Sequence, residues 1–181
     1  MILLKNLQDK QDVKKSYALY KKAFPKEEQK PFKFLLNGVK KGFYELFVVS
    51  DDENSFYGIA FMVKRDNIVL LDFLAIDEEF RNQGLGSKVL KLLQEKYANK
   101  KLVIEIENTT VPAKNIVDRL RRKEFYLRNN MVMQNFNVLL FGCPMHILSY
   151  GGDITFENYF SIFEMLYGKK KASKKVVVSK Q

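Results

Sequence analysis

The segment from Arg81 to Ser87, with the sequence Arg-Asn-Gln-Gly-Leu-Gly-Ser, has the residue types of an anion-binding turn. It lies between the strongly apolar run Ile68 to Ile76 and residues 85 to 97, where apolar side chains recur at helical spacing. A helix start presents unbonded main-chain N–H groups with a partial positive charge, and glycine lets a diphosphate approach the main chain closely. Arg81 can add a charge-assisted hydrogen bond. The segment therefore predicts a diphosphate site, although the same pattern also suits a plain glycine turn.

Three carboxylates on two predicted strands are candidates for proton transfer or for binding a cation. Alternation along residues 102 to 107 places Glu105 and Glu107 on one face of that strand. Asp72 lies inside the apolar run that ends at Ile76, and a buried carboxylate needs a partner or a purpose. For each of the three, a solvated or salt-bridged structural role is an equal alternative.

The periodicity of the chain predicts the elements that hold these residues. Helical spacing predicts helices at residues 11–23, 27–39, 85–97, 112–129 and 154–167. Apolar and β-branched runs predict strands at residues 44–50, 56–64, 68–76, 102–107, 131–138 and 145–150. Turn formers at residues 51–55 make the first two strands an antiparallel hairpin. The helix between strands 68–76 and 102–107 makes those two strands parallel.

The segment from Leu74 to Ser87 resembles the signature of the GNAT superfamily of N-acyltransferases. In that family an apolar strand ends in Leu-Ala-Val, and Arg/Gln-x-x-Gly-x-Gly/Ala follows at a fixed offset. Here Leu74-Ala75-Ile76 and Arg81-x-x-Gly84-x-Gly86 stand at that offset. The predicted order of elements is also that of the family. The resemblance implies a single three-layer α/β domain over residues 1–168, in which helices flank a central mixed, mostly antiparallel sheet and strands 68–76 and 102–107 splay apart.

The resemblance also implies that acetyl-CoA is the cosubstrate, with no metal. Pantetheine would pair like an added strand with the main chain near Leu74 and Ile76, and the pyrophosphate would lie on the Arg81–Ser87 segment. The implied cofactor-binding residues are Leu74, Ala75, Ile76, Arg81, Asn82, Gln83, Gly84, Leu85, Gly86 and Ser87. The acetyl group would pass directly from the thioester to a primary amine of a small molecule or peptide.

In many family members the catalytic acid is a tyrosine late in the fourth helix, within a Tyr-x-x-x-Gly-Phe pattern, and Tyr126 stands in that place. Asn130 and Met131 replace the glycine and the phenylalanine, but Asn is the next-best residue for a left-handed helix end. Tyr126 would protonate the departing thiolate, and a packed structural tyrosine is the alternative. For the base that accepts the proton of the amine, we prefer Glu105 over Glu107.

Asp72 and Tyr150 are the candidates for binding the acceptor. Tyr150-Gly151-Gly152 resembles a Tyr-Gly ending of a bacterial subgroup of this superfamily, in which this strand end shapes the acceptor pocket. A glycine turn beside a packed tyrosine is the alternative. Cys143 and His146 stand three residues apart on an extended segment, so we do not expect them to form a nucleophilic pair.

Composition limits the class of protein. With 181 residues, 46% hydrophobic residues and 15 Phe, the chain suits one domain with a sizeable core, and its apolar runs are far shorter than the ~20 residues of a membrane span. A single cysteine cannot form an internal disulfide, and the first residues lack the pattern of a secretion signal. We therefore expect a cytoplasmic protein that does not bind a membrane, and whether it is a monomer or a homodimer stays open.

Much of the net charge of +10 lies in residues 169 to 181, a lysine-rich segment without an acidic residue. Like charges repel, so we expect a basic, disordered tail. Two other functions stay open beside the enzyme. One is a noncatalytic module that binds or senses acyl-CoA. The other, which we rank last, is a nucleic-acid-binding protein that uses the tail together with Arg119, Arg121 and Arg122.

Overall fold

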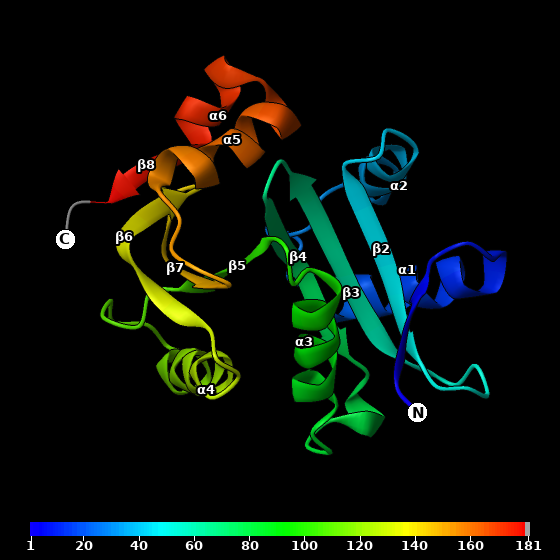
Figure 1. Cartoon of the computed structure of the whole chain (residues 1–181). Helices are drawn as coiled ribbons and strands as arrows, with labels where there is room; N and C mark the ends of the chain where they lie inside the picture. The colour runs from blue at the N-terminus through cyan, green and yellow to red at the C-terminus, as the bar shows by residue number, and fades with distance from the viewer. Residues whose placement is uncertain (180–181) are drawn as a thin grey trace. The chain divides into compact units, whose positions relative to one another are not determined.

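The computed structural model describes residues 1–179 and has the mixed α/β fold that the sequence predicts (Figure 1). The strands are β1 (Leu3–Asn6), β2 (Tyr44–Ser50), β3 (Phe56–Arg65), β4 (Ile68–Ile76), β5 (Lys101–Glu107), β6 (Val132–Leu140), β7 (Cys143–Tyr150) and β8 (Val176–Ser179). The α-helices are α1 (Lys10–Ala23), α2 (Phe32–Lys40), α3 (Leu85–Lys96), α4 (Ile116–Leu127), α5 (Phe156–Tyr167) and α6 (Lys169–Lys175). A 3-10 helix spans Glu78–Phe80.

The strands are hydrogen-bonded in the order β1-β2-β3-β4-β5-β7-β6-β8. The pairing of β4 with β5 is parallel and joins Ile68–Leu70 to Lys101–Val103. The other pairings with a defined register are antiparallel, namely β1 with β2, β2 with β3, β5 with β7, β6 with β7, and β6 with β8. The predicted mixed sheet with one parallel pair is therefore confirmed.

The chain divides into two compact units, and the single domain over residues 1–168 stays a prediction. The first unit contains Met1–Lys64 and Leu71–Lys96. The second contains Arg65–Leu70 and the described residues from Tyr97 onward. Strand β4 contributes to both units, because its first three residues pair with β5 while the rest belongs to the first unit.

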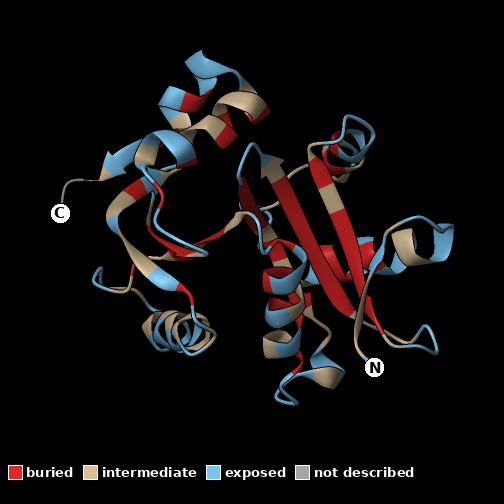
Figure 2. Cartoon of the chain, viewed as in Figure 1, coloured by how far each residue is buried: buried red, intermediate tan, exposed pale blue. Residues whose placement is uncertain are grey.

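The first unit is built on a buried hairpin. Most residues of β2 and the middle of β3 are buried, as Figure 2 shows. Asp51 closes the turn between the two strands, since its carboxylate accepts hydrogen bonds from the main chain of Glu53 and Ser55 and from the Tyr57 hydroxyl. Helix α1 begins at a capping Asp9, whose side chain accepts from the N–H of Asp12. Side chains from α1 and its C-cap, α2, β3 and β4 meet in an aromatic cluster of Tyr20, Phe24, Phe32, Phe61 and Phe73.

The second unit places helix α5 against its strands. Tyr159, Ile162, Phe163 and Leu166 are the buried residues of α5. Helix α4 starts at Ile116, four residues later than predicted; residues 113–116 form a turn in which the N–H of Ile116 donates to the Ala113 carbonyl at 3.2 Å, and Asn115 is the N-cap. Asn130 has φ 64°, so it does take the left-handed position that ends this helix.

The lysine-rich segment differs from the disordered tail that its charge suggested. Residues 169–175 form α6, and residues 176–179 form β8, which pairs with β6. Ala172 and Val176 are buried, and the Lys175 ammonium lies 4.4 Å from the centre of the Phe141 ring. The apolar side chains among the lysines, Ala172 and Val176, therefore pack against the rest of the protein, although the charge of the segment suggested disorder. Lys180 lies outside the described residues.

No α-helix within residues 1–179 has the length and apolar character needed to cross a membrane.

Candidate functional site

The predicted anion-binding turn connects the end of β4 to the start of α3. Asn82 and Gly84 both have left-handed backbones, with φ 62° and +74°. A Cβ added at Gly84 would meet no atom within 4 Å, so the space beside this residue is open. Left-handed φ is costly for most residues but not for glycine, and asparagine tolerates it better than most. The turn therefore has the glycine where the backbone needs it, and it leaves its surface accessible.

The main-chain N–H groups of this turn are unbonded over five successive residues. The first helical hydrogen bond runs from the N–H of Lys88 to the carbonyl of Gly84, at 3.2 Å. Among the described residues, none of the N–H groups from Gln83 to Ser87 has an acceptor. Such groups at a helix start carry the positive end of the helix dipole. The geometry suits a bound anion with several oxygens, such as a diphosphate.

Arg81 holds the turn to the end of the preceding strand. Its Nε donates to the carbonyl of Ile76 at 3.1 Å, and its guanidinium lies 3.9 Å from Glu78. Gln83 also turns back, because its side-chain amide donates to the carbonyl of Glu79. The Arg81 side chain is half exposed, so its remaining donors can still meet an anion.

Strand β4 presents alternate residues on one face. Asp72, Leu74 and Ile76 are partly exposed, whereas Phe73 and Ala75 between them are buried. Gly58 of β3 approaches the last part of β4 closely, and a Cβ there would lie 2.3 Å from the Ala75 carbonyl oxygen. The strand that carries the predicted pantetheine-binding residues is therefore held tightly from one side.

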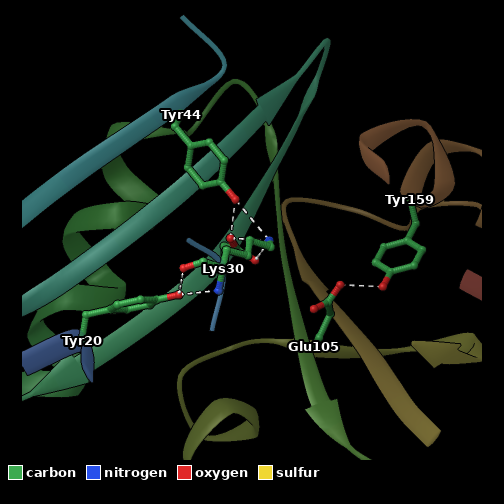
Figure 3. Close-up of polar contacts among 6 residues, drawn as sticks. Tyr20, Lys30, Tyr44, Glu105 and Tyr159 are labelled. Carbon is green, nitrogen blue, oxygen red and sulfur yellow. Dashed lines mark hydrogen bonds and ion pairs between the residues drawn. The ribbon is translucent and has the colours of Figure 1, made fainter. Parts of the chain in front are cut away.

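Asp72 is paired with a lysine that the sequence did not single out. The Lys30 ammonium lies 2.7 and 2.6 Å from the two carboxylate oxygens, and the Tyr44 hydroxyl donates to the second oxygen at 2.6 Å. The main chain of Lys30 is fixed as well, because its N–H donates to the Tyr20 hydroxyl and its carbonyl accepts from it (Figure 3). Asp72, which we expected to bind the acceptor, is thus engaged in a buried ion pair. Nothing in the sequence around Lys30 distinguishes it from the neighbouring lysines.

Glu107, the second candidate base, is engaged by two arginines of α4. Its carboxylate lies 3.0 Å from Arg119 and 2.7 Å from Arg122, and it accepts a further hydrogen bond from Asn115 at 3.2 Å. The Glu107 charge is balanced by these contacts, and the cluster of one glutamate and two arginines keeps a net charge of +1. The sequence allowed either a catalytic or a salt-bridged structural role for Glu107, and the structure shows it in a salt bridge. Arg121 pairs with Asp118 on the exposed side of the helix.

Glu105 has a different partner. The hydroxyl of Tyr159, on α5, donates to its Oε1 at 2.5 Å (Figure 3). The glutamate is only partly buried, while Tyr159 is fully buried. The sequence predicted α5 as a packing helix and did not indicate that one of its tyrosines reaches β5.

Tyr126 lies in the last turn of α4, and burial raises the pKa of its hydroxyl to about 12, with Arg122 lowering it in part. Tyr126 is partly exposed, its hydroxyl makes no hydrogen bond within residues 1–179, and the packed structural tyrosine stays the alternative to a catalytic acid. At neutral pH this phenol stays protonated, which is the state that a proton donor needs. The helix end is closed by the N–H of Met131, which donates to the Tyr126 carbonyl at 3.1 Å.

Tyr150 ends β7 opposite Leu102 of β5 and is partly exposed. The following Gly151 has φ +86°, and a Cβ there would lie 2.9 Å from the Lys100 carbonyl oxygen. The glycines after Tyr150 are thus required by the turn and by this close approach.

Cys143 and His146 do not form a pair. Cys143 is exposed, whereas buried His146 bonds Asn137 through Nδ1 at 2.8 Å and accepts the N–H of Thr109 at Nε2, at 3.2 Å. The pKa of His146 is lowered by burial and, to a smaller degree, by Lys123. No cluster of His, Cys, Asp and Glu suited to a metal ion occurs in the part of the chain that the structure describes.

The candidate residues fall into two groups. The first unit holds the anion-binding turn, the exposed face of β4 and the Lys30–Asp72 pair. The second unit holds Glu105, Glu107, Tyr126 and Tyr150.

Known proteins resemble this chain in sequence and in fold. Residues 42–130 match the family model described as the acetyltransferase (GNAT) domain. A GNAT-family protein of Bacteroides thetaiotaomicron has a similar structure, with TM-score 0.76 and 20% identity over 93% of this chain and 99% of that one. Spermidine N-acetyltransferase of Vibrio cholerae, in complex with CoA and spermine, has TM-score 0.65 and 12% identity over 82% and 94% of the two chains. An acetyltransferase of Bacillus subtilis in complex with CoA has TM-score 0.58 and 15% identity over 82% and 95%. No curated protein sequence matches the chain.

Proposed function

We propose that this chain, which belongs to the GNAT superfamily of acetyltransferases, transfers the acetyl group of acetyl-CoA to the primary amine of a small molecule or peptide. The observation that carries the proposal is the row of unbonded N–H groups from Gln83 to Ser87, at an open left-handed glycine. These are the groups that a coenzyme A pyrophosphate requires. The family match covers this turn together with β4, β5 and α4.

In the proposed reaction, an ammonium group on the acceptor first gives a proton to Glu105, since only the neutral amine has a lone pair. The amine nitrogen attacks the thioester carbonyl carbon, and a C–N bond forms as the C–S bond breaks. Tyr126 donates its proton to the leaving sulfur and regains one from the nitrogen of the new amide. One ammonium and one acetyl-CoA thus yield one amide, one coenzyme A thiol and one proton, which Glu105 releases to water. Glu107 and Asp72 are not assigned to this step, because each is held in its own ion pair.

Calorimetry with coenzyme A tests the binding site. We expect the parent protein to bind, and Gly84→Glu to weaken binding at least ~10-fold, since an added carboxylate repels the pyrophosphate and 1.4 kcal/mol corresponds to a tenfold change. Gly42→Glu is the matched control, because Gly42 also has a left-handed backbone, with φ +81°, and no atom within 4 Å of an added Cβ. Parent protein that does not bind coenzyme A, or Gly84→Glu that binds as the parent does, contradicts the proposal.

Release of coenzyme A thiol from acetyl-CoA in the presence of different amines tests catalysis. The panel includes spermidine and spermine, because one structurally similar protein is a spermidine N-acetyltransferase, together with aminoglycoside, amino-acid and peptide amines. Tight binding of coenzyme A without thiol release from any amine favours the alternative of a noncatalytic acyl-CoA-binding module.

A further inference from the structure

Tyr159 contacts the candidate base from a helix outside the segment that matches the family model. Its hydroxyl donates to Oε1 of Glu105 at 2.5 Å, and the side chain is 0% exposed (Figure 3). The family match ends at residue 130, so α5 (Phe156–Tyr167) lies beyond it. The contact is therefore a feature of the carboxy-terminal part of this chain.

The start of α5 is fixed by a reciprocal cap. The N–H of Asn158 donates to the Thr155 hydroxyl at 3.2 Å, and the N–H of Thr155 donates to the Asn158 side chain at 3.3 Å. The N–H of Tyr159 then makes a 3.1 Å hydrogen bond to the Thr155 carbonyl. Because Tyr159 follows this capping box directly, its backbone has little freedom to move relative to the cap.

A chain of polar contacts ties the cap to the strands. The side chain of Gln134, on β6, donates to the Ser149 hydroxyl at 2.8 Å and accepts from the N–H of Ile154 at 2.9 Å. Ser149, on β7, donates to the Gly152 carbonyl at 2.7 Å. Gln134 lies where the register of β6 against β7 shifts, so the irregular part of β6 serves to hold the segment before α5.

The ring of Tyr159 is held independently of its hydroxyl. It packs against Phe163, with ring centroids 5.1 Å apart, and against Phe136, at 6.2 Å. A hydroxyl on a fully buried ring needs a hydrogen-bond partner, and an ionised carboxylate is a strong acceptor. A donor that bonds the charged form of a carboxylate favours that form over the protonated one.

We propose that Tyr159 is a positioning residue for acyl transfer, whose hydroxyl keeps the Glu105 carboxylate ionised and in one orientation so that it can accept the proton of the acceptor amine. The role in acyl transfer rests on the proposed function. Tyr159 gains no charge and loses no proton in the step, and it acts through its hydrogen bond to Glu105.

Carbon-13 NMR of the glutamate carboxyl groups tests the effect of the Tyr159 hydrogen bond on Glu105, and it requires no enzymatic turnover. Glu105→Gln identifies the Glu105 signal, and its titration midpoint is compared between the parent and Tyr159→Phe. We expect the midpoint to rise by about one pH unit in the variant, because a donor to the ionised form is lost. Tyr57→Phe is the matched control, since the Tyr57 hydroxyl donates to the carboxylate of Asp51 in a surface turn. An unchanged Glu105 midpoint in Tyr159→Phe overturns the inference.

The pH dependence of thiol release gives the kinetic arm. In Tyr159→Phe the acidic limb of kcat/KM should move to higher pH by the same amount, up to a ~10-fold loss below the limb, while affinity for coenzyme A stays that of the parent. If Tyr159→Phe lowers kcat/KM by the same factor at every pH, the positioning role is overturned. If the parent protein releases no thiol with any amine, the proposed function fails, and the NMR titration still decides the Tyr159–Glu105 relationship. Tyr159→Phe keeps the contacts of the ring and is expected to fold. If it does not fold, Tyr159→Leu is used in its place.

Discussion

The Lys30 ammonium and the Asp72 carboxylate form a bidentate ion pair, with distances of 2.7 and 2.6 Å and side chains that are 13% and 7% exposed. The rings of Phe73 and Tyr44 lie 5.5 and 5.9 Å from the same ammonium. The pair links the segment before α2 to the middle of β4. It therefore fixes the part of the first unit that precedes the predicted pantetheine-binding residues.

Replacing Asp72 with Asn should strongly destabilise the protein. The substitution leaves the Lys30 charge buried without a carboxylate, and breaking a buried pair in this way costs ~3–5 kcal/mol. The free energy of unfolding in urea measures the effect. The double variant Lys30→Met with Asp72→Leu should recover most of the loss, because no buried charge remains. A double variant as unstable as Asp72→Asn would contradict this account.

Replacing Tyr126 with Phe should lower kcat by ~10²-fold or more and leave coenzyme A binding unchanged, because the proposed proton donor to the leaving sulfur is lost. Thiol release and calorimetry measure the two quantities. The exposed Tyr17 provides the control variant Tyr17→Phe. Since the pKa of Tyr126 is about 12, its ionisation should produce no alkaline limb in the rate below roughly pH 11. Full activity in Tyr126→Phe would remove this residue from the mechanism.

Acid should destabilise the second unit through His146. The pKa of this buried histidine is lowered by folding, so the unfolded chain binds more protons than the folded one as the pH falls below its ordinary value of ~6.5. The stability contribution is complete above that pH and declines by at most ~1.4 kcal/mol per pH unit as the pH falls towards the folded pKa. Because the chain has one histidine, a single Cε1 proton resonance reports its titration. A midpoint at or above the ordinary value would contradict the prediction.

The packing of the lysine-rich segment can be tested with two neighbouring valines. Val176 is 2% exposed and Val177 is 47% exposed, although both lie in β8. Val176→Asp should lower the free energy of unfolding by ~2–4 kcal/mol, whereas Val177→Asp should change it by no more than ~0.5 kcal/mol. Equal effects of the two substitutions would show that this segment does not pack on β6 in solution.

The sequence predicted the fold well where its periodicity was strong. The apolar run of β4, the stripe of α3 and the turn at Gly84 all follow from local pattern and backbone chemistry. The Asn130 position was predictable for the same reason, since few residues accept a left-handed helix end. The start of α4 was predicted four residues too early, because residues 113–116 form a separate turn before the helix.

The partners of the candidate carboxylates could not be predicted. Lys30 is 42 residues from Asp72 in the sequence, and Tyr159 is 54 residues from Glu105. Which long-range partner a carboxylate finds depends on tertiary packing, which leaves no local pattern. The structure of α6 and β8 was missed because charge repulsion outweighed two apolar positions in the sequence argument.

The low exposure of Lys30 also affects whether acetyl-CoA, the proposed cosubstrate, could acetylate this side chain. A protein that holds acetyl-CoA exposes its own lysines to spontaneous acetylation, which requires an accessible amine in its neutral form. Lys30 lies beside a carboxylate and two aromatic rings, and only 13% of its side chain is exposed, so it is poorly placed for this reaction. If the chain binds acetyl-CoA as proposed, exposed lysines such as Lys169 and Lys170 of α6 would be the ones open to this reaction.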